Sequence, residues 1–259
     1  MKSIRKILVY FLGIKTYLKI VSKTYIKMTD MGMMKSKYPE LFFLDDLIQS
    51  DWTSIDIGSN LGYYSNRIAK KMNTGKLYAV EPIPLFVDVW KTNIDHRSPN
   101  ITLFNLALGS ENKEVTMSIP TKNGVIRHGL TKIDEQEQED EGIEKAYTYS
   151  VQMKRSEEVF QSIEKIDFIK IDVEGYEQFV LSSMENILSE KLPIIQAELG
   201  GDENRKNSYA LLKSMGYELY FLKDQSLTKL SEKNFYSLSQ DIYFIHPDKK
   251  KKIEHLFEV

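Results

Sequence analysis

The sequence contains no cysteine. This absence excludes disulfide bonds, thiolate zinc sites and a cysteine nucleophile, and it suits a reducing compartment, so we expect a cytoplasmic protein. The formal net charge is only -2. The molecule therefore has no overall field that would select nucleic acid, and we expect no nucleic-acid partner. Near the N-terminus the uncharged stretch runs only from Ile7 to Ile14, which is far too short to span a bilayer.

The N-terminal segment carries apolar residues at helical spacing, at positions 4, 7, 8, 11, 14, 18, 21 and 25. Basic residues fall mostly on the other side of the predicted helix. Two interpretations stay open. Residues 1–27 could pack on the domain, or they could lie on an anionic surface at the inner face of the membrane, as basic amphipathic helices do. We treat residues 1–50 as an N-terminal helical extension.

From Trp52 onward, short apolar runs alternate with helical patterns, and no proline- or glycine-rich linker interrupts them. This alternation predicts one α/β domain with a parallel sheet and helices on both faces. We place that domain at residues 51–247, with an insertion at 120–150 and a basic tail at 248–259. Folds of this kind bind ligands at the carboxyl ends of their strands, so residues that end strands are the candidates for function.

The loop "DIGSNLGYYS" joins the first predicted strand to its helix. Gly58 lets the chain turn sharply, and Gly62 lets backbone approach another group closely at the helix start. Free N–H groups at a helix N-terminus favour an anionic ligand. Asp56 precedes the loop, where it can accept a hydrogen bond from an ammonium group or orient the loop. Taken alone, the loop could equally be a plain tight turn.

Glu81 ends the second predicted strand, in "YAVEP", about 20 residues beyond the glycines. A carboxylate there suits two ribose hydroxyls. The glycine spacing is G-x-x-x-G, which lacks the arrangement that makes room for a pyrophosphate. A nucleoside carrying an amino acid in place of the pyrophosphate suits this loop better, and S-adenosylmethionine has that shape.

Carboxylates cluster again in "FIKIDVEGYE", directly after an apolar run that reads as a buried strand. Asp172 ends this strand and therefore faces the ligand crevice. It could accept the proton of an alcohol during group transfer, or it could ligate Mg²⁺, which would acidify that hydroxyl. Glu198 ends the next strand and would be its neighbour in either role. The alternative is that Asp172 only caps the helix that follows.

Three further residues are weaker candidates for function. Glu174 and Glu177 lie at the start of a helix, where acids are favourable near the positive end of the dipole. We expect Glu177 to be structural or solvated and Glu174 to face either solvent or the acceptor. His128 lies in the excursion between Thr121 and Tyr147, which could overhang the acceptor pocket, so it is a candidate catalytic base.

Five segments in this order, "DIGSNLGYYS", "VEP", "NLALG", "IDFIKIDVEGYE" and "AELG", resemble the FkbM-type S-adenosylmethionine-dependent methyltransferases. The resemblance runs from about Thr53 to Leu222. It implies a class I methyltransferase fold, which is a Rossmann-like, seven-stranded sheet with an antiparallel last strand. It also implies an enzyme of the EC 2.1.1 type that methylates an oxygen, commonly a hydroxyl of a sugar, a glycan or a natural-product scaffold.

The resemblance also implies roles for individual residues. Glu81 would hold the ribose, and Asp172 would lie beside the sulfonium and the incoming hydroxyl. Ser59 stands in the loop where many members have alanine. The remaining cofactor contacts would come from Asp56, Gly58, Asn60 and Gly62 at the methionine end, and from Asn105, Ala107 and Leu108 at the adenine.

Two other functions stay open on the sequence. One is an NAD-dependent oxidoreductase, against which the missing third glycine counts. The other is a non-catalytic binding module that keeps the fold. For the enzyme we expect a small-molecule or glycan acceptor, and Tyr147 and Tyr149 of the excursion are candidates to stack on a sugar ring. We expect no resident metal except Mg²⁺, if Asp172 and Glu198 ligate one. The oligomeric state is left open.

Overall fold

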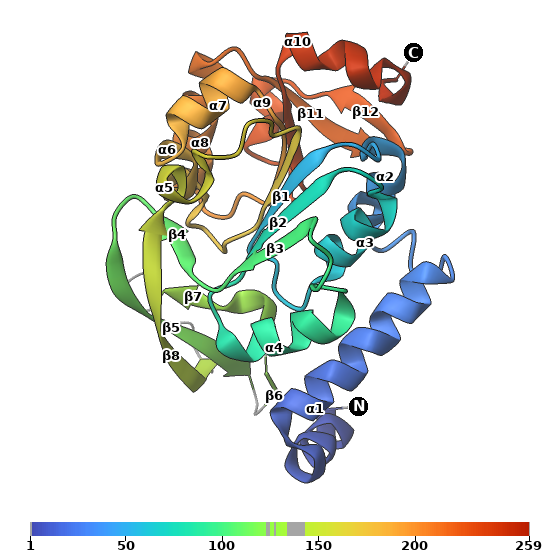
Figure 1. Cartoon of the computed structure of the whole chain (residues 1–259), viewed down its shortest axis with the longest axis vertical. Coiled ribbons are helices and arrows are strands. Elements are labelled where there is room, and N and C mark those ends of the chain that lie inside the picture. Colours follow the sequence, from blue (N-terminus) through green and yellow to red (C-terminus); the bar gives the residue numbers. More distant parts are fainter. Residues whose placement is uncertain (1, 123–124, 127, 134–142, 259) are drawn as a thin grey trace.

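The structure is a computed structural model that describes residues 2–122, 125–126, 128–133 and 143–258. Its main sheet has the strand order β12-β11-β13-β10-β9-β1-β2-β3 (Figure 1). Five adjacent strands are parallel to one another, namely β3, β2, β1, β9 and β10. Strand β13 is antiparallel to both its neighbours, β10 and β11. The strands are β1 Thr53–Ile57, β2 Lys76–Val80, β3 Ile101–Phe104, β9 Phe168–Ile171, β10 Ile194–Ala197, β11 Glu218–Lys223, β12 Ser226–Lys229 and β13 Ile242–Ile245.

The sheet confirms the predicted α/β architecture with an antiparallel last strand, and it carries one strand more than the seven expected. The additional strand, β12, forms a hairpin with β11, in which Lys223 pairs with Ser226. The two residues between them, Asp224 and Gln225, both have positive φ. Such two-residue turns match the twist of antiparallel strands, which explains why a segment expected to be a loop adds to the sheet edge.

Helices cover both faces of the sheet, as the alternation predicted. The apolar side chains of β1 and β9, such as Ile55 and Ile169, pack against α6, α7 and α8. The opposite face packs against α2 and α3. The helices are α1 Lys2–Asp30, α2 Pro39–Leu47, α3 Tyr63–Lys71, α4 Pro84–Asn93, α5 Ser156–Phe160, α6 Glu177–Ser182, α7 Glu185–Lys191, α8 Asp202–Ser214, α9 Glu232–Phe235, α10 Pro247–Lys250 and the 3₁₀ helix η3 Lys251–Leu256.

A second sheet lies beside the main one, where the sequence predicted a hairpin-like excursion (Figure 1). The run "NITLFNLAL", expected to be one strand, is divided, because β4 leaves the main sheet to pair with β8. The excursion contributes a long antiparallel pair, β5 and β8, with short pieces along it. The elements are β4 Ala107–Gly109, β5 Lys113–Lys122, β6 Val125–Ile126, the 3₁₀ turn η1 His128–Leu130, β7 Lys132–Ile133 and β8 Ile143–Arg155.

Segments near both ends of the chain pack on the domain. Leu18 of α1 is buried among core residues of α4 and the second sheet. Phe43 of α2 and Ile253 of the basic tail are buried in the core beneath the main sheet. Residues on either side of the predicted boundaries at 50 and 247 thus contribute to the same core. None of the helices in the described part of the chain is long and apolar enough to cross a membrane.

Candidate active site

A row of polar side chains crosses the middle of the main sheet, on the face that α2 and α3 cover. In the strand register, Asp56 lies beside Lys170, and Lys170 lies beside Gln196. Gln196 in turn lies beside Tyr243. All four side chains are buried. Burying polar groups beneath helices is costly unless they satisfy one another, so this row is a candidate for function rather than for stability.

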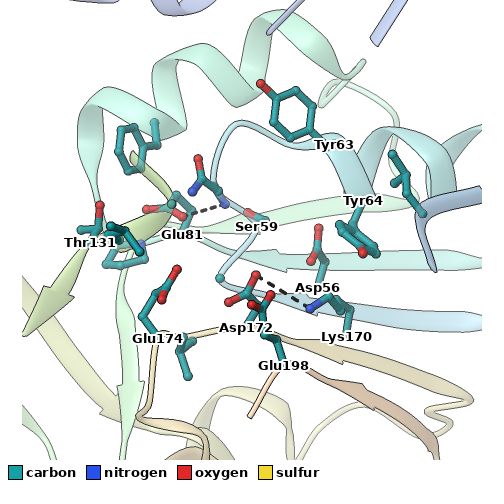
Figure 2. A pocket seen from close by; sticks show the side chains of 18 of the residues that line it. Asp56, Ser59, Tyr63, Tyr64, Glu81, Thr131, Lys170, Asp172, Glu174 and Glu198 are labelled. Carbon is teal, nitrogen blue, oxygen red and sulfur yellow. Dashed lines mark hydrogen bonds and ion pairs between the residues drawn. The ribbon is translucent and has the colours of Figure 1, made fainter. Parts of the chain in front are cut away.

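Asp172 and Glu198 follow directly after β9 and β10, at the carboxyl ends of these parallel neighbours. The N–H of Glu198 donates to the carbonyl oxygen of Ile171, which holds the two strand ends together. Because residues two apart share a face of a strand, Asp172 stands above Lys170. Figure 2 shows Asp172, Glu198 and Lys170 gathered at one part of the pocket. The predicted pair of strand-end acids is thus brought together.

Lys170 is the buried cation of this cluster. Its Nζ lies 3.8 Å from Oδ2 of Asp172 and 3.5 Å from Oδ2 of Asp241. It also lies over the ring of Tyr64, 5.1 Å from the centroid. Burial alone would lower the pKa of Lys170, but Asp241, Asp172 and Glu198 raise it above its usual value. The ammonium therefore stays charged and favours the ionised form of the carboxylates around it.

The pKa values of both acids are raised. Burial raises the pKa of Asp172, and the nearby Lys170 opposes this shift. Partial burial, and then the charge of Asp172, raise the pKa of Glu198 to about 7. Two acids whose environments move their pKa values toward neutrality are suited to taking up a proton under physiological conditions.

Asp172 does not cap the helix that follows it. Helix α6 begins at Glu177 and has no side-chain cap. The buried carboxylate of Glu177 instead accepts from the N–H groups of Val173 and Gly175, at 2.9 and 3.2 Å. Glu177 is therefore structural, as predicted, and it holds the loop in place. This leaves the Asp172 carboxylate directed at the cavity, together with Glu174.

Gly58 brings the loop after β1 against the end of β9. Its φ is +77°, and a Cβ atom there would lie 1.9 Å from the carbonyl oxygen of Asp172, so no side chain can be accommodated. Gly62 has a different structural role. It begins α3 with a φ of +87°, and a Cβ atom would lie 2.8 Å from the ring of Trp90. The sequence predicted a cofactor contact for Gly62; in the structure it packs against Trp90 and does not line the cavity.

Glu81 is buried at the end of β2 and fixes the glycine loop. Its two carboxylate oxygens accept from the N–H groups of Asn60 and Ile83, both at 2.8 Å. Burial raises the pKa of Glu81 to about 8, and the two N–H groups oppose this. Asn105 also supports this turn, because its amide donates to the carbonyl oxygens of Glu81 and Pro82, both at 2.9 Å. Asn105 thus positions Glu81 and does not line the cavity.

Asp56 makes a contact that the sequence did not reveal. It accepts from the hydroxyl of Ser65 in α3, and that hydroxyl accepts from Trp90 Nε1 at 3.0 Å. Burial raises the pKa of Asp56 to about 6. Of the two roles left open for Asp56, orienting the loop and its helix is the one that these bonds describe, although Asp56 also lines the cavity.

The cavity encloses about 640 Å³ and joins these groups. Asp56, Gly58, Ser59, Asn60 and Glu81 line it with Asp172 and Glu198. A smaller apolar pocket adjoins it, with Gly58, Pro82, Met117 and Val173 common to both linings. Ala107 and Leu108 line this smaller pocket. A cavity that carries several acids, next to an apolar recess, matches a ligand with a polar body and a flat apolar end.

The loop offers an unused hydrogen-bonding group to such a ligand. The hydroxyl of Ser59 is buried, and it has no hydrogen-bond partner among the described residues. Buried hydroxyl groups are rarely left unpaired unless a ligand or water meets them. Ser59, the Gly58 backbone and the Glu81 carboxylate therefore fit a nucleoside with a charged substituent.

A family model described as "Methyltransferase FkbM domain" matches residues 56–222. The chain belongs to the FkbM methyltransferase family. Methyltransferase sdnD of Sordaria araneosa is 25% identical over 189 residues, which cover 64% of this chain and 73% of the relative. The AMB antimetabolite synthetase AmbE of Pseudomonas aeruginosa is 23% identical over 234 residues, which cover 77% of this chain but only 11% of that protein.

Among solved structures, an FkbM methyltransferase from Methylobacillus flagellatus aligns with a TM-score of 0.48 and 14% identity, over 76% of this chain and 44% of that one. The chain thus spans less than half of that structure. The matched family region contains both the glycine loop and Asp172, so the family assignment and the site fall on the same residues. Membership in the family and the fold support an S-adenosylmethionine-dependent methyltransferase and leave the oxidoreductase hypothesis without support.

Tyrosines line a further part of the cavity in this FkbM-family chain. Tyr25 of α1 lies 4.4 Å from Tyr63 and 5.4 Å from Tyr38, measured between ring centroids. These three line the cavity together with Tyr64. No sequence pattern indicated them, because they come from three separate segments. The tyrosines of β8 that were expected to stack on a sugar, Tyr147 and Tyr149, pack against the core of the second sheet instead.

The excursion reaches the cavity as predicted, through Met117, Gly129, Leu130 and Thr131. His128 lies in the short turn η1 next to Gly129, but its side chain is outside the described part of the structure. Its catalytic role stays a prediction.

The donor set suits a metal ion poorly. Among the described residues, no group of three or more histidines or acids is arranged to hold one. The Lys170 ammonium, 3.8 Å from Asp172, would also repel a divalent cation. We therefore derive no step through Mg²⁺. Activity measured with EDTA and without added Mg²⁺ tests that choice.

Proposed function

We propose that this protein transfers a methyl group from S-adenosylmethionine to a hydroxyl oxygen of a sugar, glycan or natural-product acceptor, as an enzyme of the EC 2.1.1 type. The proposal is supported by one observation above all. A single cavity joins the loop at Ser59 and Glu81, which suits a nucleoside, to a pair of strand-end acids, Asp172 and Glu198. Asp172 forms an ion pair with a buried lysine.

The cofactor, when bound, supplies an electrophilic methyl group on a sulfonium. Glu81 has carboxylate lone pairs left after its two backbone contacts and would accept from the ribose hydroxyls. The unpaired hydroxyl of Ser59 would donate a hydrogen bond to the cofactor or accept one from it. Ala107 and Leu108 would face the adenine with apolar surface. These residues would bind the cofactor and orient it.

The acids favour oxygen as the acceptor atom. An alcohol keeps its proton at neutral pH, so methylation of an alcohol needs a base, whereas a neutral amine attacks without one. In the proposed step the hydroxyl oxygen bonds to the methyl carbon while the carbon–sulfur bond breaks, and its proton passes to the Asp172 carboxylate. Lys170 keeps that carboxylate ionised before the step, and Glu198 can share the proton after it.

The tyrosines favour a ring-shaped or polyol acceptor. Tyr25, Tyr38 and Tyr63 line the cavity, and the ring of Tyr25 packs against the other two. Such side chains stack on sugar rings and donate hydrogen bonds to them. We also propose that the enzyme works in the cytoplasm, in contact with the inner face of the membrane through residues 1–27.

Incubation with methyl-labelled S-adenosylmethionine and a panel of glycans and hydroxylated natural products tests the proposal. We expect label in an alkali-stable methyl ether. Label on an amine would contradict oxygen transfer. Tight cofactor binding with no transfer to any acceptor tried, and none to a cell extract, would favour the binding-module hypothesis.

A further inference from the structure

We propose that residues 5–12 of α1 dock on an anionic lipid bilayer and hold the mouth of the cavity against it. This inference rests on the proposed function, because it assigns where the acceptor is met. Six of its eight residues are apolar, and most of its side chains face solvent. Their exposed fractions are 53% for Ile7, 41% for Leu8, 84% for Tyr10, 78% for Phe11 and 40% for Leu12. Contiguous exposed apolar side chains of this kind mark interaction surfaces.

The segment is separate from the part of α1 that packs on the domain. Gly13, with φ 71° and ψ 155°, interrupts α1 and divides it into two pieces. Beyond it, Leu18 is buried in the core, and Lys15 forms a 2.5 Å ion pair with Asp88 of α4. Ser22, also buried, accepts from Asn93 at 2.9 Å. The second piece therefore anchors α1, while the first presents its apolar side chains outward.

The charges around the segment select an anionic partner. Arg5 and Lys6 are exposed on the segment itself. Further lysines follow along α1, and no acidic residue precedes Asp30. Apolar side chains beside cations that can extend to headgroups are the pattern of helices lying in a membrane interface. The cytoplasmic leaflet is negatively charged and attracts such segments. A protein partner would not require that all charged residues of this segment be positive.

The segment is also part of the active-site wall. Arg5 lines the cavity, as does Val21 from the second piece of α1. Leu130, an apolar residue 44% exposed, lines it from η1. Helix α1 further contacts β6, at the lower end of the molecule in Figure 1. A bilayer bound by residues 5–12 therefore lies next to the cavity, which suits an acceptor hydroxyl carried on a membrane lipid.

Vesicle sedimentation with the full-length chain tests the docking. Vesicles of phosphatidylcholine alone are compared with vesicles that also contain phosphatidylglycerol. We expect the protein to pellet with the anionic vesicles, less so as salt is raised, and not with neutral ones. The double variant Tyr10→Ser and Phe11→Ser should lower the partition by about tenfold or more. Tyr236→Ser is the matched control, since Tyr236 is 50% exposed elsewhere.

Two readouts keep this inference distinct from the proposed function. Neither Tyr10 nor Phe11 lines the cavity, so the affinity for S-adenosylhomocysteine should be unchanged in the double variant. Equal pelleting of the double variant and the parent would overturn the proposal. So would a dimer in sedimentation equilibrium that the double variant converts to monomer without any effect of lipid, because a second copy would then occupy the segment.

Discussion

The ammonium of Lys170 lies 3.8 Å from Oδ2 of Asp172, two residues further along the same strand end. Burial raises the pKa of Asp172, and Lys170 acts against that shift. A base works best when its pKa lies near the working pH and its ionised form is populated. This neighbour therefore sets how strongly Asp172 attracts a proton, and we assign Lys170 a positioning role beneath the proposed base.

Replacing Asp172 by Asn should keep the affinity for the cofactor product and lower turnover by about 10²–10⁴-fold, the range for loss of a general base. The reason is that the amide cannot accept the acceptor's proton, while Gly58 and Glu81 stay in place. Turnover is measured with labelled S-adenosylmethionine, and affinity by calorimetry. Asp202→Asn, at an exposed position in α8, is the control. Unchanged turnover in Asp172→Asn would make Asp172 structural.

The pH dependence of turnover should respond in opposite directions to two variants. Asp172 must be ionised to act, and burial raises its pKa, so the wild-type rate falls with decreasing pH at a higher pH than an ordinary aspartate would give. Asp241→Asn removes the negative neighbour that also raises this pKa and should move the acid limb to lower pH. Lys170→Met removes the cation and should move it to higher pH. Shifts in the same direction would contradict the assigned roles.

Replacing Gly58 by Ala should destabilise the protein by more than about 2 kcal/mol and abolish cofactor binding. Its φ is +77°, and the added Cβ would meet the Asp172 carbonyl oxygen at 1.9 Å. Gly200→Ala is the matched control, since a Cβ there meets nothing within 4 Å and φ lies outside the left-handed region. Thermal unfolding and calorimetry measure both effects. Equal behaviour of the two variants would show that the loop and β9 are not in close contact.

Tyr25→Leu should raise the KM for the acceptor several-fold while leaving the affinity for S-adenosylhomocysteine unchanged. Tyr25 lies against Tyr63 in the part of the cavity assigned to the acceptor. Tyr147→Leu is the comparison, because Tyr147 was the sequence candidate and packs in the second sheet. A larger effect on KM from Tyr147 than from Tyr25 would place the acceptor elsewhere.

Sequence patterns predicted the residues that end strands. Asp56, Glu81, Asp172 and Glu198 all lie at the carboxyl ends of neighbouring strands, because apolar runs locate strands and parallel strands share an edge. Gly58 was predicted for the right physical reason, a close backbone approach. The eighth strand was missed because its two-residue turn, Asp224 and Gln225, lacks glycine, the usual signal for positive φ.

Lys170 was missed because a single lysine between isoleucines looks like the solvent side of an alternating strand. Its burial depends on Asp241, which is close only through the pairing of β10 with β13. Tyr25, Tyr38 and Tyr63 were missed for a similar reason, since only the packing of α1 brings them together. Gly62 and Asn105 were credited with ligand contacts, but their neighbours Trp90 and Glu81 are revealed only by the fold.

Calorimetry with S-adenosylhomocysteine tests the central claim most directly, because it measures binding of the cofactor product and needs no acceptor. We predict binding in the micromolar range for the parent protein. Glu81→Ala should weaken it by about 1.5–3 kcal/mol, the range for a lost hydrogen bond to a charged group. No heat with S-adenosylhomocysteine, together with tight binding of NADH, would contradict the account.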